Sequence, residues 1–241
     1  MSRSLEACAA RLHLLFGAGV ECDVVPVNGD PADLWPAESE CVAAAVLSRR
    51  REFAAGRACA RRLLARLGFE PAALLAAKDR SPLWPSGAIG SIAHDEQLCA
   101  VAVAHADRVA GIGLDVEPDA PLEEELWPEL FLASELDRLA ACPHHARGNM
   151  ARVYFSAKEC VYKCTYAHVG ATLGFRDVEI LLAPGSCRFR ALVHHPAGAA
   201  LSDVVLEGFH LACAGSILTG MSLATAALLP SRRPAAALSS T

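Results

Sequence analysis

The chain has 241 residues, a formal net charge of −5 and a hydrophobic fraction of 53%. This length allows one large domain or two smaller ones, and the acidic balance argues against a general nucleic-acid-binding protein. No apolar run reaches the roughly 18–20 residues of a membrane-spanning helix, and the first residues lack a secretory signal pattern. Ten cysteines are scattered among alanines and leucines, as small buried apolar residues would be. We therefore expect a cytoplasmic protein with reduced thiols.

The first hundred residues predict helices followed by a β-hairpin. Apolar residues recur at helical spacing between residues 38 and 68, and Gly68 marks the end of that helix. Two alternating segments then flank a turn, which places His94 at the tip of a hairpin and not in a core. This position alone leaves open whether His94 is an exposed turn residue or a functional one. In chain order we expect a helix over Leu5–Phe16, a strand over Cys22–Val27, the helix over 38–68, and strands over Ala88–Ala93 and Leu98–His105.

The segment 111–118 predicts a strand with two carboxylates on one side. Apolar residues at every second position face one way, while Gly113, Asp115 and Glu117 face the other. Residues two apart on a strand are about 6.6 Å apart, so both carboxylates can reach one divalent cation. Glycine also leaves room for a close approach to the backbone. An ordinary half-exposed strand has the same pattern, so this segment alone leaves metal binding open.

The rest of the chain predicts short helices, one longer helix and antiparallel strands. Helices are expected over Leu122–Leu130 and Ser134–Cys142, a loop around Pro143–Gly148, and strands over 175–182, 187–194 and 204–226. Helix followed by antiparallel strands thus occurs on both sides of the carboxylate strand. We predict an α+β fold of two similar halves, residues 1–112 and 113–229, with the active site between them. Residues 230–241 form an Ala/Pro/Ser-rich tail that we expect to be disordered.

A second signal lies at residues 155–164. Ser156 and Glu159 have the spacing of a capping box, and Glu159 can pair with Lys163 one turn later. That structural interpretation leaves Lys158 without a role. In the functional interpretation, Glu159 and its two flanking lysines face the carboxylates of the strand, and the group suits phosphate chemistry assisted by Mg²⁺.

Five motifs in order resemble the 4′-phosphopantetheinyl transferases of the Sfp-type superfamily, in particular the bacterial subgroup that serves siderophore synthetases (enterobactin type). They are EFAAGR at 52–57, RSPLWP at 80–85, GSIAH at 90–94, GLDVE at 113–117 and FSAKECVYK at 155–163. The resemblance implies a monomeric pseudo-dimer of two α+β halves. It also implies transfer of 4′-phosphopantetheine from coenzyme A to a serine of an apo acyl or peptidyl carrier protein, with release of adenosine 3′,5′-bisphosphate.

Carried over to this chain, the resemblance implies three groups of site residues. Asp115, Glu117 and Glu159 would bind Mg²⁺, or Mn²⁺ in its place, and Glu159 would help to deprotonate the carrier serine. Lys158 and Lys163 would neutralise the pyrophosphate, and both lysines are expected to assist catalysis. The residues expected to bind coenzyme A are Arg49, Arg57, Arg80, His94, Lys158 and Lys163.

Two departures from the family pattern and two other functions remain to be weighed. Ala93 stands where serine or threonine usually precedes the histidine, and Cys160 replaces a serine or alanine. A non-catalytic module that binds coenzyme A or a nucleotide, and an Mg²⁺-dependent phosphohydrolase, would use the same residue types. Neither nucleic acid nor a membrane is expected as a partner.

Overall fold

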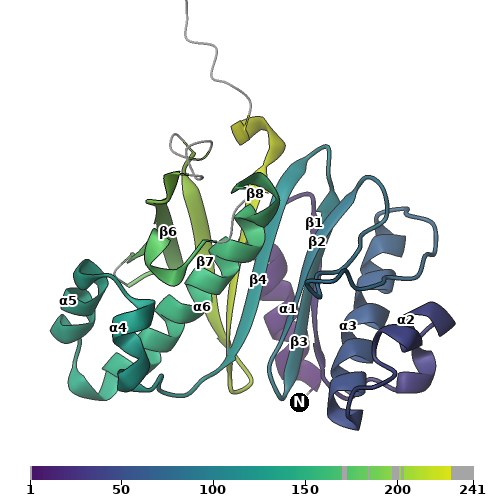
Figure 1. Ribbon diagram of the computed structural model, residues 1–241, viewed down its shortest axis with the longest axis horizontal. Helices are drawn as coiled ribbons and strands as arrows, with labels where there is room; N and C mark the ends of the chain where they lie inside the picture. Colours follow the sequence, from purple (N-terminus) through teal and green to yellow (C-terminus); the bar gives the residue numbers. More distant parts are fainter. Residues whose placement is uncertain (1, 170–172, 184, 197–200, 202–203, 229–241) are drawn as a thin grey trace, which may run out of the picture.

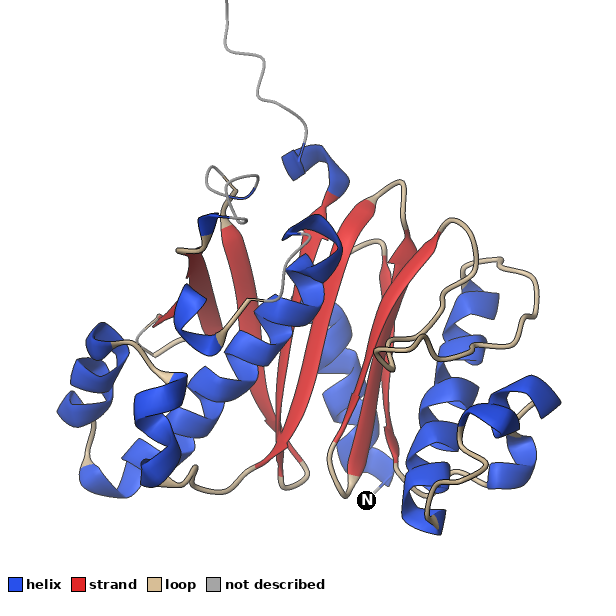
Figure 2. Cartoon of the chain, viewed as in Figure 1, coloured by secondary structure: helices blue, strands red, loops and turns tan. Residues whose placement is uncertain are grey.

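The computed structural model describes residues 2–169, 173–183, 185–196, 201 and 204–228 (Figure 1). The strands form two antiparallel sheets, and most of the helices flank them (Figure 2). This arrangement confirms the predicted α+β class. None of the described helices has the length and apolar character needed to cross a membrane. The predicted tail, 230–241, lies outside the described residues.

The first half is built on a three-stranded sheet in the order β1-β3-β2. The helix α3 covers one face of this sheet, and an apolar core of alanine, leucine, cysteine and valine fills the space between them. The other face of the sheet packs toward the second half (Figure 1). The elements are α1 (Ser2–Phe16), β1 (Val20–Pro26), a 3-10 turn (Pro31–Asp33), α2 (Pro36–Cys41), α3 (Leu47–Arg66), β2 (Ala88–His94) and β3 (Leu98–His105).

The second half has a five-stranded sheet in the order β4-β8-β7-β6-β5, crossed on one face by the long helix α6 (Figure 1). Its elements are β4 (Val109–Pro118), α4 (Trp127–Leu130), α5 (Ala133–Ala141), α6 (His144–Val169), β5 (Val178–Leu182), β6 (Arg188–Val193), β7 (Leu206–Cys213) and β8 (Ser216–Ala224). Short 3-10 turns lie at Glu124–Leu126, Phe175–Asp177 and Thr225–Leu228. Because β4 begins at Val109, the predicted division at 112/113 falls inside a strand.

A single apolar core joins the two halves. It draws residues from β1, β2 and β3 of the first sheet and from β4, β7 and β8 of the second. The helix α1 contributes Leu5, Leu12 and Phe16 to this core and packs on β1, β7 and β8, behind the junction of the sheets in Figure 1. The first helix of the chain therefore contacts strands of both sheets rather than belonging to the first half alone.

Two predicted helices have different limits in the structure. The helix expected over residues 38–68 is interrupted between α2 and α3. Helix α6 begins at His144, where a loop was expected, so Ser156 lies in its middle and not at its start. The prediction of a capping box at Ser156 is therefore wrong. Gly148 is tolerated inside the helix, and Pro143 marks the true boundary, since proline is disfavoured in helix interiors but not before them.

The two halves repeat one buried contact. In each half, a fully buried glutamate on a short helix accepts hydrogen bonds from two backbone N–H groups. It also forms an ion pair with a cationic side chain of the long helix that follows. Glu38 of α2 accepts from Trp35 N at 3.0 Å and Leu74 N at 2.9 Å, and it pairs with Arg61. Glu135 of α5 accepts from Leu132 N at 2.9 Å and Ile180 N at 2.8 Å, and it pairs with Lys158 at 2.7 Å.

The repeat extends to the sequence spacing, because in both halves the cation follows the glutamate by 23 residues. A buried carboxylate is stable only when its hydrogen-bonding capacity is met and its charge is paired. Glu38 and Glu135 both satisfy this requirement. The equivalence supports the predicted similarity of the two halves at the level of individual side chains, and it gives Lys158 the position that Arg61 holds in the first half.

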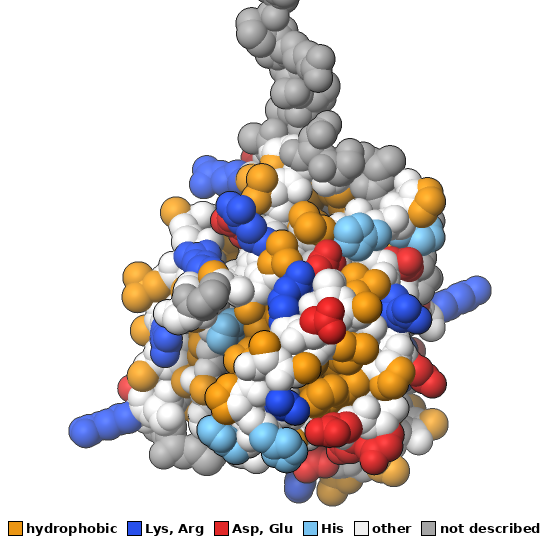
Figure 3. All heavy atoms as spheres, turned by 90° about the vertical axis from the view of Figure 1, so that its left-hand side faces the viewer, with side chains coloured by type: hydrophobic (Ala, Val, Ile, Leu, Met, Phe, Trp, Pro, Cys, Tyr) orange, Lys and Arg blue, Asp and Glu red, His pale blue; other side chains and the backbone are white. Residues whose placement is uncertain are grey.

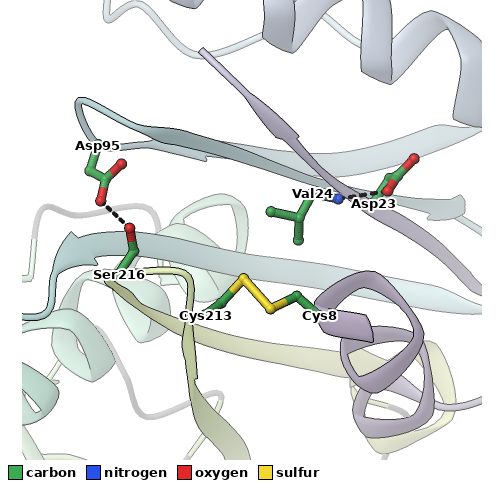
Figure 4. The surroundings of a disulfide bond; sticks show 6 residues. All are labelled: Cys8, Asp23, Val24, Asp95, Cys213 and Ser216. Atoms are coloured by element: carbon green, nitrogen blue, oxygen red, sulfur yellow. Dashed lines mark hydrogen bonds between the residues drawn. A yellow bond between two sulfur atoms is a disulfide. The ribbon is translucent and has the colours of Figure 1, made fainter. Parts of the chain in front are cut away.

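The structure contains one disulfide, between Cys8 of α1 and Cys213 of β7 (Figure 4). The expectation that all thiols are reduced is therefore not met for this pair. The other eight cysteines are free, and five of them are buried, as expected for small apolar residues. Close to the bridge, Ser216 donates to Asp95 at 2.5 Å and links the β7–β8 turn to the β2–β3 turn (Figure 4).

Candidate functional site

Helix α6 lies along β4 in a regular register. Four helix residues, slightly more than one turn, advance about 6.0 Å, and two strand residues advance about 6.6 Å. Every fourth helix residue therefore meets every second strand residue. The meeting pairs are Arg152 with Glu117, Ser156 with Asp115, Cys160 with Gly113 and Cys164 with Gly111. The predicted alternation of β4 is confirmed, since Ile112, Leu114 and Val116 lie in the shared core.

Helix α6 can lie this close to β4 only because positions 111 and 113 of the strand are glycines. A Cβ atom on Gly113 would lie 1.9 Å from the carbonyl oxygen of Cys160, and one on Gly111 would lie 2.3 Å from that of Cys164. Helix and strand backbones thus touch at this end of β4. The room that these glycines leave is filled by the helix itself. Beyond them, Asp115 and Glu117 emerge from the same face of the strand, opposite the middle of α6.

Asp115 is held at both of its oxygens. Ser156 donates to Oδ2 at 2.8 Å, and the ammonium of Lys163 donates to Oδ1 at 2.6 Å. Burial alone would lower the pKa of Lys163, but the charges of Asp115 and Glu159 raise it. Lys163 is therefore cationic, and it was correctly expected to face the carboxylates of the strand.

Glu117 is held by a residue that the sequence did not single out. Arg152 donates from Nη1 to Oε2 at 3.0 Å, and its remaining nitrogens donate to the carbonyls of Ala120 and Pro121. Burial and the nearby charge of Asp115 raise the pKa of Glu117 to about 7 in spite of this ion pair. The site thus has more negative charge than its two cations offset.

Glu159 has no hydrogen-bond or ion-pair partner within the described part of the chain. Burial and the charge of Asp115 raise its pKa, and Lys163 acts in the opposite direction. The three carboxylates, Asp115, Glu117 and Glu159, therefore have two cationic side chains near them, Lys163 and Arg152. Oxygen ligands with surplus negative charge suit a hard divalent cation, so the donor set fits the predicted ion. As the side chains stand, no three described His, Cys, Asp or Glu residues form a finished metal site.

The side chain of Lys158 points away from the carboxylates of β4, toward α5 and the start of β5. Its side chain is 1% exposed and its ammonium contacts Glu135 at 2.7 Å and the carbonyls of Phe175 and Val178, both at 2.7 Å. Burial lowers its pKa, and the pair with Glu135 counteracts this. The view that Lys158 lacks a structural partner is wrong. Its three donors are all used in joining α6 to α5 and β5, so it has none left for a pyrophosphate in this arrangement.

The residues predicted to hold the nucleotide fall into two groups. Arg49 and His94 come together, with Arg49 Nη1 2.5 Å from His94 Nε2 and 3.1 Å from Glu52. Burial and the charge of Arg49 lower the pKa of His94. The imidazole is thus neutral, with Nε2 accepting from Arg49 and the proton on Nδ1, which faces Glu52 at 3.7 Å.

Arg57 is a buried member of the predicted set. Its Nε donates to the carbonyl of Leu74 at 2.6 Å, and its guanidinium stacks over Phe53. Burial lowers its pKa to about 10. These contacts tie α3 to the segment that follows it. Ala93, the departure from the family pattern, is also buried, within the core between the halves.

A cavity of about 440 Å³ lies between the two halves and brings Arg80 and Lys163 to one space. Its walls come from the loop 79–84, from β2 and β4, and from α6. Tyr166 of α6 donates to Asp79 at 3.1 Å, so the loop of the first half reaches the helix of the second. A smaller cavity of about 210 Å³ adjoins Glu159, and Tyr162 lines both. The predicted placement of a site between the halves agrees with this geometry.

Sequence reasoning missed Arg152, Glu135 and Thr219. Arg152 could have been found from helical spacing, since residues 152, 156, 159 and 163 share one face once α6 is known to start before Ser156. Glu135 and Thr219, which contacts Ser156, had no such signal, because each meets α6 from another element at a sequence separation that no helix or strand period relates.

Comparison with known proteins identifies the family of the chain. Residues 37–104 match the family model of the 4′-phosphopantetheinyl transferase N-terminal domain, and residues 111–214 match that of the 4′-phosphopantetheinyl transferase superfamily. The chain is 36% identical to the 4′-phosphopantetheinyl transferase Svp of Streptomyces mobaraensis over 203 residues, which cover 82% of each chain.

Two further relatives have similar names. The chain is 34% identical to the 4′-phosphopantetheinyl transferase Npt of Nocardia iowensis, over 70% of this chain and 75% of that one. It is 31% identical to the 4′-phosphopantetheinyl transferase PptT of Mycobacterium tuberculosis, over 81% of both. These matches span both halves, and the chain therefore belongs to the 4′-phosphopantetheinyl transferase superfamily.

Proposed function

We propose that this chain, as a phosphopantetheinyl transferase, moves 4′-phosphopantetheine from coenzyme A to the serine of an apo carrier protein in an Mg²⁺-dependent reaction. The observation that carries the proposal is the carboxylate of Glu159. It is half-buried and partnerless among the described residues, it shares the field of Asp115 and Lys163, and it lies beside a cavity. A carboxylate kept without a partner is available for a cation or a proton.

Each side chain then has a defined task in the transfer. Asp115, Glu117 and Glu159 would hold Mg²⁺, which when bound would neutralise negative charge on the oxygens of the pyrophosphate. Lys163 would place a further positive charge on the phosphate oxygens. The carrier serine attacks the β-phosphorus, its oxygen–phosphorus bond forms, and the bond to the leaving adenosine 3′,5′-bisphosphate breaks. The serine proton passes to Glu159, directly or through a water molecule.

Coenzyme A would bind in the larger cavity between the halves. We assign the nucleotide and its phosphates to Arg49, Arg80, His94 and Lys163. Arg80 and Lys163 line the cavity, and Arg49 and His94 are partly exposed side chains of the neighbouring α3 and β2. Arg57 and Lys158, which were expected to contact the ligand directly, would support binding by fixing the backbone beside it. This distinction follows from their hydrogen bonds to buried carbonyls.

The partner is a carrier domain of a nonribosomal peptide or polyketide pathway, with a siderophore synthetase as the predicted client. Carrier proteins of this class are acidic, and this chain is acidic as well, so docking must rely on local surface character. On the face that carries α4 and α5, hydrophobic side chains lie between separate groups of acidic and basic ones (Figure 3). We expect the enzyme to act as a monomer in the cytoplasm.

The proposal is tested by mass spectrometry of several apo carriers after incubation with the enzyme, coenzyme A and Mg²⁺. A gain of one phosphopantetheine supports transfer, and the relative rates identify the preferred carrier. Hydrolysis of coenzyme A without a carrier would indicate the phosphohydrolase, and binding without reaction would indicate the non-catalytic module. Replacement of Asp115, Glu117 or Glu159 by alanine should abolish transfer while thermal unfolding shows an intact fold.

A further inference from the structure

We propose that Ser156 and Thr219 position Asp115 for binding of a divalent cation. The inference rests on the proposed function, and it assigns two hydroxyl groups that touch neither substrate nor ion. Both side chains are fully buried, and Asp115 itself is 5% exposed. They act on the cation only through the orientation of the Asp115 carboxylate.

The three side chains form a closed hydrogen-bonded group. Ser156 Oγ lies 2.8 Å from Asp115 Oδ2 and 2.9 Å from Thr219 Oγ1, and Thr219 Oγ1 lies 2.9 Å from the carbonyl oxygen of Ser156. Thr219 is the direct cross-strand neighbour of Asp115 in the β4–β8 register. It therefore projects from the same face of the sheet, toward α6. The group joins two strands and the helix at the point where the carboxylate stands.

Proton accounting fixes the direction of these bonds. Asp115 as a carboxylate can only accept, so the single hydroxyl proton of Ser156 must be donated to Oδ2. Ser156 Oγ then has lone pairs to offer but no proton. Thr219 has one proton, and both Ser156 Oγ and the Ser156 carbonyl oxygen lie 2.9 Å from its Oγ1 as acceptors. Donated to Oγ, this proton holds Ser156 in the rotamer that reaches Asp115. A valine at 219 would keep the shape and lose this donor.

A second hydroxyl on the same helix shows what Ser156 would ordinarily do. Thr165 is also fully buried in α6, and it donates to the carbonyl of Val161 one turn earlier, at 2.8 Å. This is the usual bond of a hydroxyl inside a helix. Ser156 instead donates out of the helix to Asp115. The neighbours of Thr219 on its face of β8 are Ile217, Met221 and Leu223, so its hydroxyl is an exception in an apolar row.

The arrangement opposes the pull of Lys163 on Asp115. Lys163 holds Oδ1 at 2.6 Å, and without a bond at Oδ2 the carboxylate is free to rotate into a tighter pair with that ammonium. Held from both sides, each oxygen of Asp115 keeps a lone pair for another ligand. Hydrogen bonds to a ligating carboxylate orient it, and their loss typically costs about 10–100-fold in metal affinity.

The experiment measures direct binding of Mn²⁺ by its electron paramagnetic resonance signal, with coenzyme A present and no carrier protein. Ser156→Ala and Thr219→Val should each raise the Kd for Mn²⁺ by about tenfold or more. Thr219→Ser, which keeps the donor, should restore most of the affinity. Thr165→Val is the matched control, since it removes a buried hydroxyl of the same helix that does not touch Asp115, and its Kd should equal that of the wild type.

Steady-state kinetics provide the second readout. At saturating Mg²⁺ the kcat of Ser156→Ala should recover toward the wild-type value, as a loss confined to metal affinity requires. Wild-type Mn²⁺ affinity in both Ser156→Ala and Thr219→Val overturns the inference while leaving transfer by the wild type intact. Equal losses in Thr165→Val also overturn it. A wild type that neither binds Mn²⁺ nor transfers phosphopantetheine refutes the proposed function itself.

Discussion

Lys158 and Lys163 stand five residues apart on α6, and their ammonium groups have opposite surroundings. Lys158 is enclosed by Glu135 and two carbonyls, while Lys163 pairs with Asp115 and lines the larger cavity. A buried pair leaves an uncompensated charge behind when one member is removed. The partly exposed pair of Lys163 has less effect on stability and more on a ligand that enters the cavity.

Replacement of the two lysines by glutamine should therefore separate stability from activity. Lys158→Gln should lower the free energy of unfolding by about 3–5 kcal/mol, because Glu135 stays buried without its cation. Lys163→Gln should lower the free energy of unfolding by less, because the Lys163 side chain is partly exposed and Ser156 still donates to Asp115. It should reduce kcat/KM at least tenfold, which corresponds to about 1.4 kcal/mol. Urea unfolding and steady-state kinetics on both variants test this. Unchanged unfolding in Lys158→Gln would contradict the role of the pair.

The contact between Arg49 and His94 leads to a prediction about the 3′-phosphate of coenzyme A. If this pair binds that phosphate, Arg49→Ala or His94→Ala should raise the KM for coenzyme A about tenfold to a hundredfold, since charge-assisted bonds contribute about 1.5–3 kcal/mol. Dephospho-coenzyme A, which lacks the group, should show little change. Equal losses on the two substrates would place the pair at the pyrophosphate or in the scaffold.

At the residue scale, the sequence could predict the side chains that the regular spacing of a strand or a helix brings to one face. Alternation along β4 identified Asp115 and Glu117, and helical spacing related Glu159 to Lys163. Lys158 and Arg57 were harder to interpret because their partners, Glu135 and the carbonyl of Leu74, belong to other elements. A sequence does not show whether a charged side chain lies in a core or in a cleft. Only the tertiary contacts of that side chain distinguish the two.

At the element scale, α6 and β4 act as one unit because their residue spacings match. Gly111 and Gly113 allow the two backbones to touch, and this contact sets the distance between Glu159 and the strand carboxylates. Sequence analysis recognised the strand and both glycines but took the helix to begin at Ser156. The pattern S-x-x-E describes a capping box only where the chain is free to start a helix, and the residues from His144 onward already form one.

Gly113→Ala should disturb this unit more than any polar replacement on its surface. The added Cβ would meet the carbonyl of Cys160 at 1.9 Å, so helix and strand must separate. Overpacking of this kind costs about 1–3 kcal/mol, and transfer activity should fall as Glu159 moves away from Asp115. Gly174→Ala is the control for stability, since its Cβ would meet only the carboxylate of Asp177 at 3.3 Å. Thermal unfolding that is unchanged in Gly113→Ala would refute the close contact.

At the scale of the whole molecule, the two halves are similar in plan and share a core. Repetition of helix and antiparallel strands predicted the similarity, and the matched pairs of Glu38 with Arg61 and Glu135 with Lys158 make it specific. The position of α1 could not be predicted, because amphipathic spacing says which face of a helix is buried but not which sheet covers it. The bridge between Cys8 and Cys213 was missed for the same reason, since 205 residues separate them.

Reduction of the bridge should lower stability without affecting chemistry. A cross-link that closes so long a loop restricts the unfolded chain, and disulfides typically contribute about 2–4 kcal/mol to stability. Thermal unfolding should therefore shift to lower temperature with dithiothreitol, and kcat at 25 °C should stay the same because neither sulfur lines the cavities. Cys8→Ser should reproduce the shift and make it insensitive to the reductant. An unchanged transition in both would show that the bridge does not stabilise the fold.

The contact of α1 with β7 and β8 also bears on how the chain folds. Helix α1 packs on strands that lie about 200 residues further along the chain, and its face of Leu5, Leu12 and Phe16 has no complete partner until β7 and β8 are made. The three-stranded sheet and α3 rest on contacts that are nearer in the sequence, so they can form before the core between the halves closes. Closure of that core is therefore a late step of folding, since contacts between distant segments form slowly.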